Sequence, residues 1–83
     1  MSVEETIREI ITRIIRKQDI DLNSTASFKD VGADSLDIVQ ILVALEDTFD
    51  IEIVDEDLKT IDNLRDFVTY IKGKVAEKEQ APN

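Results

Sequence analysis

The sequence contains no cysteine and no histidine, and it has only one proline and two glycines. Without cysteine, neither a disulfide nor a thiolate-bound metal can hold the chain together. Without histidine, the usual general base near neutral pH and the commonest metal ligand are both missing. These absences exclude Ser-His-Asp and Cys-His enzymes, zinc modules and disulfide scaffolds. In a chain of 83 residues, which has room for one small domain, we expect no catalytic residue and no metal ligand.

Basic residues are absent from a long central stretch of the chain. Residues 30–58 hold ten of the nineteen acids and none of the ten Lys and Arg, and the net charge is −9. This excess disfavours nucleic-acid binding and favours protein partners with basic surfaces. No apolar run approaches the roughly 20 residues of a membrane span, and the first residues lack the features of a secretion signal. We therefore expect a monomeric cytoplasmic protein.

Apolar residues recur at helical spacing in three longer segments, and acids favourable to a helix N-terminus begin a shorter one. The predicted helices lie at about 3–17, 34–49, 55–60 and 63–75. Ser2 and Glu5 have the spacing of a capping box before the first helix, and either Asp62 or Asn63 can cap the last. The sequence thus predicts an all-α fold, a small four-helix bundle with three longer helices and one short helix.

Residues 18–34 show no sustained period and are rich in polar residues that favour turns. They predict a long loop between the first two helices, and its apolar side chains are too numerous for a free linker. The side chains expected to pin it to the core are Ile20, Leu22, Phe28 and Val31. From about Ala76 the helical pattern ends, so we expect a domain at 1–75 and a flexible tail at 76–83.

The segment 34–49 carries apolar residues on two opposite sides of its helical wheel. The two sets are Ile38, Ile41, Leu42, Leu45 and Phe49 on one side and Leu36, Val39 and Val43 on the other. A helix in a small bundle has one core to face, so we predict that the second set is exposed and forms a docking face. Gln40, Glu46 and Asp47 border it. The alternative is that the first helix or the 18–34 loop covers this face.

The residues Gly32-Ala33-Asp34-Ser35 join the loop to the second helix. Ser35 falls in the first turn, where backbone N–H groups lack intrahelical partners and favour an attached or nearby phosphate. Asp34 and Asp37 oppose a free anion there. Without a histidine as base, Ser35 is a poor nucleophile on its own. It is either a simple capping serine or a residue that another protein activates, which indicates a modified protein rather than an enzyme.

The segments 32–37 and 44–53 together resemble those of acyl carrier proteins. The first reads Gly-Ala-Asp-Ser-Leu-Asp and the second Ala-Leu-Glu-Asp-Thr-Phe-Asp-Ile-Glu-Ile. An amphipathic helix precedes them, and Ile61 and a final helix follow. The resemblance covers roughly residues 3–75, which is nearly the whole expected domain.

This resemblance implies that Ser35 carries 4′-phosphopantetheine, with Asp34, Leu36 and Asp37 flanking the attachment point. A phosphopantetheinyl transferase would move the group from coenzyme A with Mg²⁺. The cofactor thiol would then hold acyl groups as thioesters, so a chain without cysteine can carry them. Acyl-transfer, condensing and related biosynthetic enzymes would dock through basic patches. The partner surface implied in this chain comprises Leu36, Val39, Gln40, Val43, Glu46 and Asp47.

Three departures from the family pattern leave the pathway open. Gln40 stands where many fatty-acid carriers have Glu, and Val54 stands where many have Pro. The spacing from Phe28 to Ser35 is shorter than in many fatty-acid members and resembles that of polyketide and nonribosomal peptide carriers. These departures therefore do not select among fatty-acid, polyketide and related specialised pathways.

Two other functions compete with the carrier interpretation. An unmodified acidic helical adaptor would bind basic proteins through the same face of the second helix. The acids between Asp47 and Asp57 suggest calcium binding, but an EF-hand loop needs a glycine at its sharp turn. No glycine lies between Gly32 and Gly73, which disfavours that site.

Overall fold

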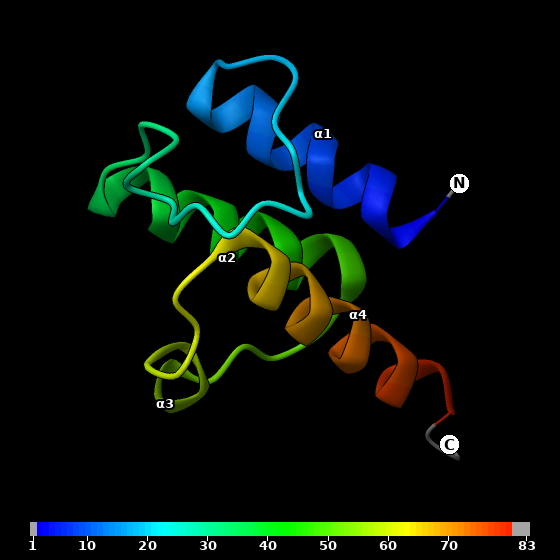
Figure 1. Ribbon diagram of the computed structural model, residues 1–83. Helices are drawn as coiled ribbons and strands as arrows, with labels where there is room; N and C mark the ends of the chain where they lie inside the picture. Colours follow the sequence, from blue (N-terminus) through cyan, green and yellow to red (C-terminus); the bar gives the residue numbers. More distant parts are fainter. Residues whose placement is uncertain (1, 81–83) are drawn as a thin grey trace.

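The computed structural model describes residues 2–80, which form four helices and no strand (Figure 1). The helices are α1 Val3–Ile15, α2 Ser35–Phe49, α3 Asp55–Leu58 and α4 Leu64–Gln80. α1 contacts both α2 and α4, while α3 lies to one side in the connection between α2 and α4. This arrangement confirms the predicted all-α bundle of three longer helices and one short one. Within residues 2–80, no helix is both long and apolar enough to cross a membrane.

α1 begins where the sequence predicts and ends slightly earlier. The Ser2 hydroxyl accepts a hydrogen bond from the Glu5 backbone N–H at 3.1 Å, as expected of an N-cap. At the other end, Arg16 adopts a left-handed conformation with φ of 62°, and its N–H returns to the Thr12 carbonyl at 2.8 Å. A residue in that conformation ends a helix, so the chain leaves α1 after Ile15 rather than near residue 17.

The core is almost entirely aliphatic and joins α1, α2, α4 and the loop after α1. Its buried members are Ile7, Ile10, Ile11, Ile20, Leu22, Ile41, Leu45, Leu64, Phe67, Val68, Ile71 and Val75. On α2, Ile41 and Leu45 are fully buried, which confirms the predicted core side of that helix. Ile38, which was assigned to the same side, is only partly buried and lies outside this cluster.

The loop 18–34 is pinned to the core as predicted. Ile20 and Leu22 are buried, and the Phe28 ring meets the Phe67 ring edge-on at a centroid distance of 5.0 Å. The loop also caps α4, because its carbonyl groups accept hydrogen bonds from the Leu64 and Arg65 N–H groups at 2.9 and 3.1 Å. Those N–H groups have no partner within their own helix. The loop and the start of α4 therefore hold each other in place.

α4 begins as predicted but continues further than expected. Asn63 accepts a hydrogen bond from the Asp66 N–H at 2.8 Å, so Asn63 rather than Asp62 caps the helix. α4 then runs to Gln80, which corrects the expectation that the helical pattern ends near Ala76. Charged residues such as Lys78 favour helix without an apolar face, and the Lys78 ammonium also pairs with Asp50 at 2.6 Å. The rest of the expected tail, residues 81–83, lies outside the described residues.

The burial of α2 predicts an unequal response to truncation on its two sides. Ile41→Ala should lower the free energy of unfolding by about 2–5 kcal/mol, because it empties a fully buried position. Val43→Ala, on the same helix but 51% exposed, should change it by less than about 0.5 kcal/mol. Urea unfolding followed by circular dichroism measures both. Equal losses would show that the two sides of α2 have been assigned wrongly.

Candidate functional site

Ser35 is the first residue of α2 and its side chain is exposed. The preceding residue caps the helix: the Asp34 carboxylate accepts from the Asp37 N–H at 2.8 Å, and Asp37 accepts from the Asp34 N–H at 3.2 Å. This reciprocal capping box confirms Asp34 as the N-cap. Ser35 therefore does not cap the helix. Within residues 2–80, no hydrogen bond involves the Ser35 hydroxyl. The structure therefore places this hydroxyl in solvent at the start of a long helix.

A tight turn fixes the position of this helix start. The Ser27 hydroxyl accepts from the Asp30 N–H, and the Asp30 carboxylate accepts from the Ser27 N–H, both at 3.1 Å. Gly32 has a φ of 93°, a conformation that L side chains avoid, and it lets the Ala33 N–H reach the Phe28 carbonyl at 2.9 Å. Because Ala33 is itself buried, the residue two positions before Ser35 is anchored in the fold.

The acids of this turn are held by short-range hydrogen bonds. The Ser27 backbone N–H, followed by the Ser27 hydroxyl, holds the pKa of Asp30 below its usual value of 3.8. Asp34 and Asp37 use one carboxylate oxygen each in the capping box. Among residues 2–80, no three acidic side chains converge in a way that could hold a metal ion.

The start of α2 fits a phosphate group attached through Ser35. Asp34 takes the N–H of Asp37, but the N–H groups of Ser35 and Leu36 have no acceptor among the described residues. Free N–H groups and the positive end of a 15-residue helix favour a negatively charged phosphodiester at this place. The neighbouring carboxylates oppose a free anion, whereas a covalent link removes the need for the phosphate to bind by itself.

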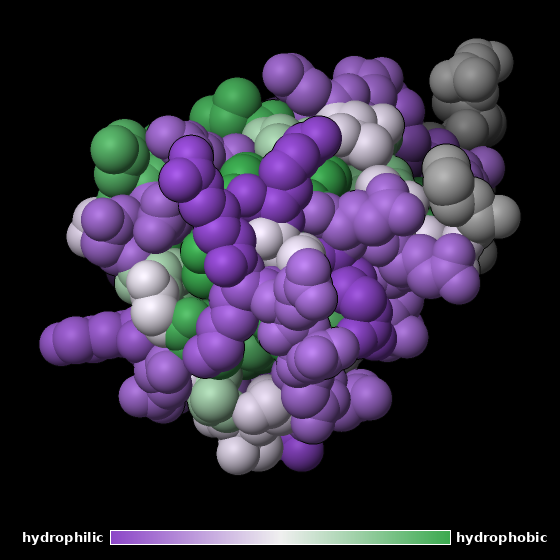
Figure 2. Space-filling view, turned by 90° about the horizontal axis from the view of Figure 1, so that it is seen from above, coloured by the Kyte–Doolittle hydropathy of each residue, from purple (hydrophilic) through white to green (hydrophobic). Residues whose placement is uncertain are grey.

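One side of α2 exposes a stripe of large hydrophobic side chains. Leu36, Val39 and Val43 are 64%, 53% and 51% exposed, which shows that neither α1 nor the 18–34 loop covers them. Seen from above, exposed hydrophobic side chains gather toward the upper left of the molecule and are bordered by hydrophilic ones (Figure 2). Gln40 is exposed between Val39 and Val43 on this stripe. An uncovered apolar stripe with a polar border is typical of a protein-binding surface.

The two acids predicted at the far end of this stripe differ in their surroundings. Asp47 is exposed and forms no ion pair among residues 2–80. Glu46 is partly buried, and its carboxylate accepts a hydrogen bond from the Ile53 N–H at 3.0 Å. It therefore ties the connection between α2 and α3 to the last turn of α2. No periodicity in the sequence predicts this hydrogen bond from Ile53 to Glu46, because it depends on how residues 50–54 turn back.

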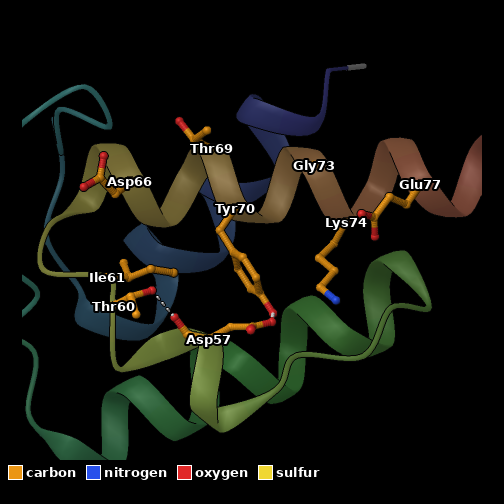
Figure 3. Close-up of a pocket in the computed structure, with 9 residues that line it drawn as sticks. All are labelled: Asp57, Thr60, Ile61, Asp66, Thr69, Tyr70, Gly73, Lys74 and Glu77. Atoms are coloured by element: carbon orange, nitrogen blue, oxygen red, sulfur yellow. Dashed lines mark hydrogen bonds between the residues drawn. The ribbon is translucent and has the colours of Figure 1, made fainter.

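A groove between α3 and α4 contains a hydrogen-bonding tyrosine that the sequence did not single out. The groove has a volume of about 550 Å³ and is open to solvent (Figure 3). Tyr70 lies along it and donates its hydroxyl hydrogen to Asp57 at 2.8 Å. Burial, followed by this hydrogen bond, raises the pKa of Tyr70 above its usual value of 10.0. No residue of α2 lines the groove, so it is separate from the Ser35 site.

Comparison with known proteins identifies the family of the chain and matches its fold. The family model of the phosphopantetheine attachment site matches residues 5–71. The fold is similar to the solution NMR structure of a holo acyl carrier protein from Geobacter metallireducens, with a TM-score of 0.82 and 24% sequence identity. That alignment covers 100% of this chain and 98% of the other. Because the family model spans most of the chain, the protein belongs to the phosphopantetheine attachment-site family.

This membership confirms the resemblance to acyl carrier proteins found in the sequence. It makes the chain a carrier domain rather than an enzyme, with 4′-phosphopantetheine as its covalent cofactor. The structure adds the local geometry: Asp34, Ser35, Leu36 and Asp37 all lie at the start of α2. The matched range includes this whole turn.

The turn before α2 can be tested through the pKa of Asp30. Ser27→Ala removes one of the two hydrogen bonds that lower this pKa, so the pKa should move part of the way back toward 3.8. A carboxyl group whose pKa is lowered by folding stabilises the folded state at pH values above its ordinary pKa, and this stabilisation is lost as the pH falls through the lowered pKa. The variant should therefore lose less stability on acidification. NMR titration of the Asp30 carboxyl group measures the shift. Ser2→Ala, which deletes a distant hydroxyl, should leave the pKa of Asp30 unchanged. Equal Asp30 pKa values in the wild type and both variants would contradict the proposed role of the Ser27 hydroxyl.

Proposed function

We propose that this protein is an acyl carrier whose Ser35 bears 4′-phosphopantetheine. The observation that carries the proposal is an exposed serine hydroxyl, free of intramolecular hydrogen bonds among residues 2–80, on the first turn of α2. It lies within the range matched by the family model. The cofactor supplies a terminal thiol that holds acyl groups as thioesters, which this cysteine-free chain does not have.

In the attachment step the chain supplies only the attacking oxygen. The Ser35 oxygen bonds to the phosphorus of the pantetheine phosphate while the phosphoanhydride bond of coenzyme A breaks, and adenosine 3′,5′-bisphosphate leaves with the electron pair. The serine proton has to go to a base of the transferase, which also supplies Mg²⁺. The chain has no histidine, and Asp34 and Asp37 are engaged in the helix cap. Their role is to hold the backbone so that the hydroxyl points outward.

Partner enzymes would recognise α2 through the exposed stripe. Leu36, Val39 and Val43 suit a shallow apolar groove, and the acids bordering them suit Lys and Arg beside that groove. The partners expected are the transferase and acyl-transfer, condensing and related enzymes. Asp37 takes part in the helix cap and Glu46 bonds to Ile53. Asp47 is therefore the α2 acid without a bond among residues 2–80, and we expect it to meet a basic partner.

Three positions bear on the pathway. The stripe is neutral at Gln40, where many fatty-acid carriers have Glu, which suits a less basic partner surface. Together with Val54 and the short spacing from Phe28 to Ser35, this favours a specialised carrier of fatty-acid, polyketide or related metabolism. The cytoplasmic location and monomeric state expected from the sequence stay predictions.

The competing function is an unmodified acidic adaptor that binds basic proteins through the same stripe. Incubation with coenzyme A, Mg²⁺ and a phosphopantetheinyl transferase distinguishes the two. Intact-mass spectrometry should show that the wild type gains one phosphopantetheine group and that Ser35→Ala gains none. Ser2→Ala, which removes an exposed serine at the start of α1, should gain it fully. If the wild type gains no mass with several transferases, the adaptor function is favoured.

The docking face predicts different effects for its two neighbouring acids. Asp47→Lys should lower transferase kcat/KM roughly 3- to 10-fold, because it reverses an uncommitted charge beside the stripe, and should leave the melting temperature nearly unchanged. Glu46→Lys should lower both, because Ile53 also loses its hydrogen-bond acceptor.

Glu9→Lys makes the same charge change at an exposed position on α1 and serves as the control. It should leave kcat/KM within about twofold of the wild type, since surface substitutions away from a binding face have small effects. If all three variants lose the same activity, net charge rather than the α2 face controls the encounter.

A further inference from the structure

α3 is the least supported helix of the fold. It has only four residues and contains no buried residue. A helix this short is not stable in water by itself. Val54, its N-cap residue, has no polar side chain to accept a hydrogen bond from the first turn. The helix therefore needs support from another part of the chain.

That support comes from Tyr70 on α4. In α2 the capping box is direct, with the N–H of the N-cap Asp34 bonded to the carboxylate of Asp37 three residues later. In α3 the equivalent groups are the Val54 N–H and the Asp57 carboxylate, and the Tyr70 hydroxyl stands between them. It accepts from Val54 at 3.4 Å and donates to Asp57 at 2.8 Å; Figure 3 shows the bond to Asp57.

We propose that Tyr70 completes the capping box of α3 from α4 and so acts as the latch that holds α3 in place. One oxygen atom bonds to both the Val54 N–H and the Asp57 carboxylate, and both bonds are lost together when α3 moves away. A backbone N–H of residue 54 is required for this arrangement, and Val54 provides it where proline would not.

The surroundings of the latch allow α3 to open without the rest of the bundle. The groove beside Tyr70 is open to solvent, and the Lys74 ammonium lies 5.6 Å from the Tyr70 ring centroid, which keeps the ring in place on α4. On the α2 side, the connection is held by the hydrogen bond from Ile53 to Glu46. Ile53, Leu58 and Ile61 only partly enter the core. Such weakly buried units open at lower free energy than the core helices, and opening α3 would expose these apolar side chains.

Amide hydrogen exchange of the apo protein, measured by NMR, tests the latch. The reporters are the N–H groups bonded within and just after α3, namely those of Asp57, Lys59, Thr60 and Ile61. Tyr70→Phe removes only the hydroxyl, and these amides should then exchange roughly tenfold faster than in the wild type. The amides of α1, and that of Leu64, which bonds to Ala26, should exchange at the wild-type rate.

Thr69→Val is the matched control. It deletes the hydroxyl of the residue before Tyr70, which lines the same groove and, among residues 2–80, bonds only within α4, to the Arg65 carbonyl. It should leave the α3 amides within about twofold of the wild type. If Tyr70→Phe leaves the exchange rates of the α3 amides unchanged, or raises the exchange rates of all amides equally, the proposal is wrong.

A double-mutant cycle adds a second, independent test. Asp57→Ala should accelerate the same amides, and the Tyr70→Phe/Asp57→Ala protein should exchange hardly faster than Tyr70→Phe alone, since Tyr70→Phe already removes the bond to Asp57. Multiplicative effects would mean that Tyr70 and Asp57 support α3 separately, which would overturn the proposal. All of these measurements use the unmodified chain, so they stand apart from the test of Ser35.

Discussion

A single aliphatic core can bury only one side of α2, and the rest of the site depends on this constraint. Ile41 and Leu45 are fully buried in the core, so the apolar residues on the other side of the helix face solvent. The same packing fixes where the helix begins, because Ala33 is buried just before it and Gly32 turns the chain outward. Ser35 and the exposed stripe therefore lie on one helix and face solvent together.

The acids of the central segment serve the fold as well as the surface charge. Asp34 and Asp37 cap α2, Glu46 holds the connection to α3, and Asp50 pairs with Lys78 of α4. Of the acids on or beside α2, Asp47 has no such bond among residues 2–80. Together these acids make residues 30–58 the most negative part of the chain. Its individual residues nevertheless differ in what they contribute, and the charge pattern alone does not reveal the difference.

The two helices on either side of residues 50–54 are stabilised in different ways. α2 is long, has its own capping box and buries one side. α3 is four residues long, and the Tyr70 hydroxyl of α4 bridges its N-cap N–H and its Asp57 carboxylate. This contrast follows from length, because a short helix has too few internal hydrogen bonds to offset the cost of nucleation. The carrier domain thus combines a long, self-capped helix with a short neighbour that is held by tertiary contacts.

The sequence by itself determined the features that arise from local patterning: three longer helices, the exposed side of α2, the N-caps at Ser2 and Asp34, and the family motif around Ser35. These follow from helical period and from hydrogen bonds between residues a few positions apart. Tertiary structure alone decided the rest, including the task of Glu46, the Tyr70 bridge to α3 and the continuation of α4 to Gln80. The first two are contacts between residues that are distant in the chain. The last turn of α4 has no apolar periodicity and is joined to Asp50 through Lys78, so no local apolar pattern predicts it.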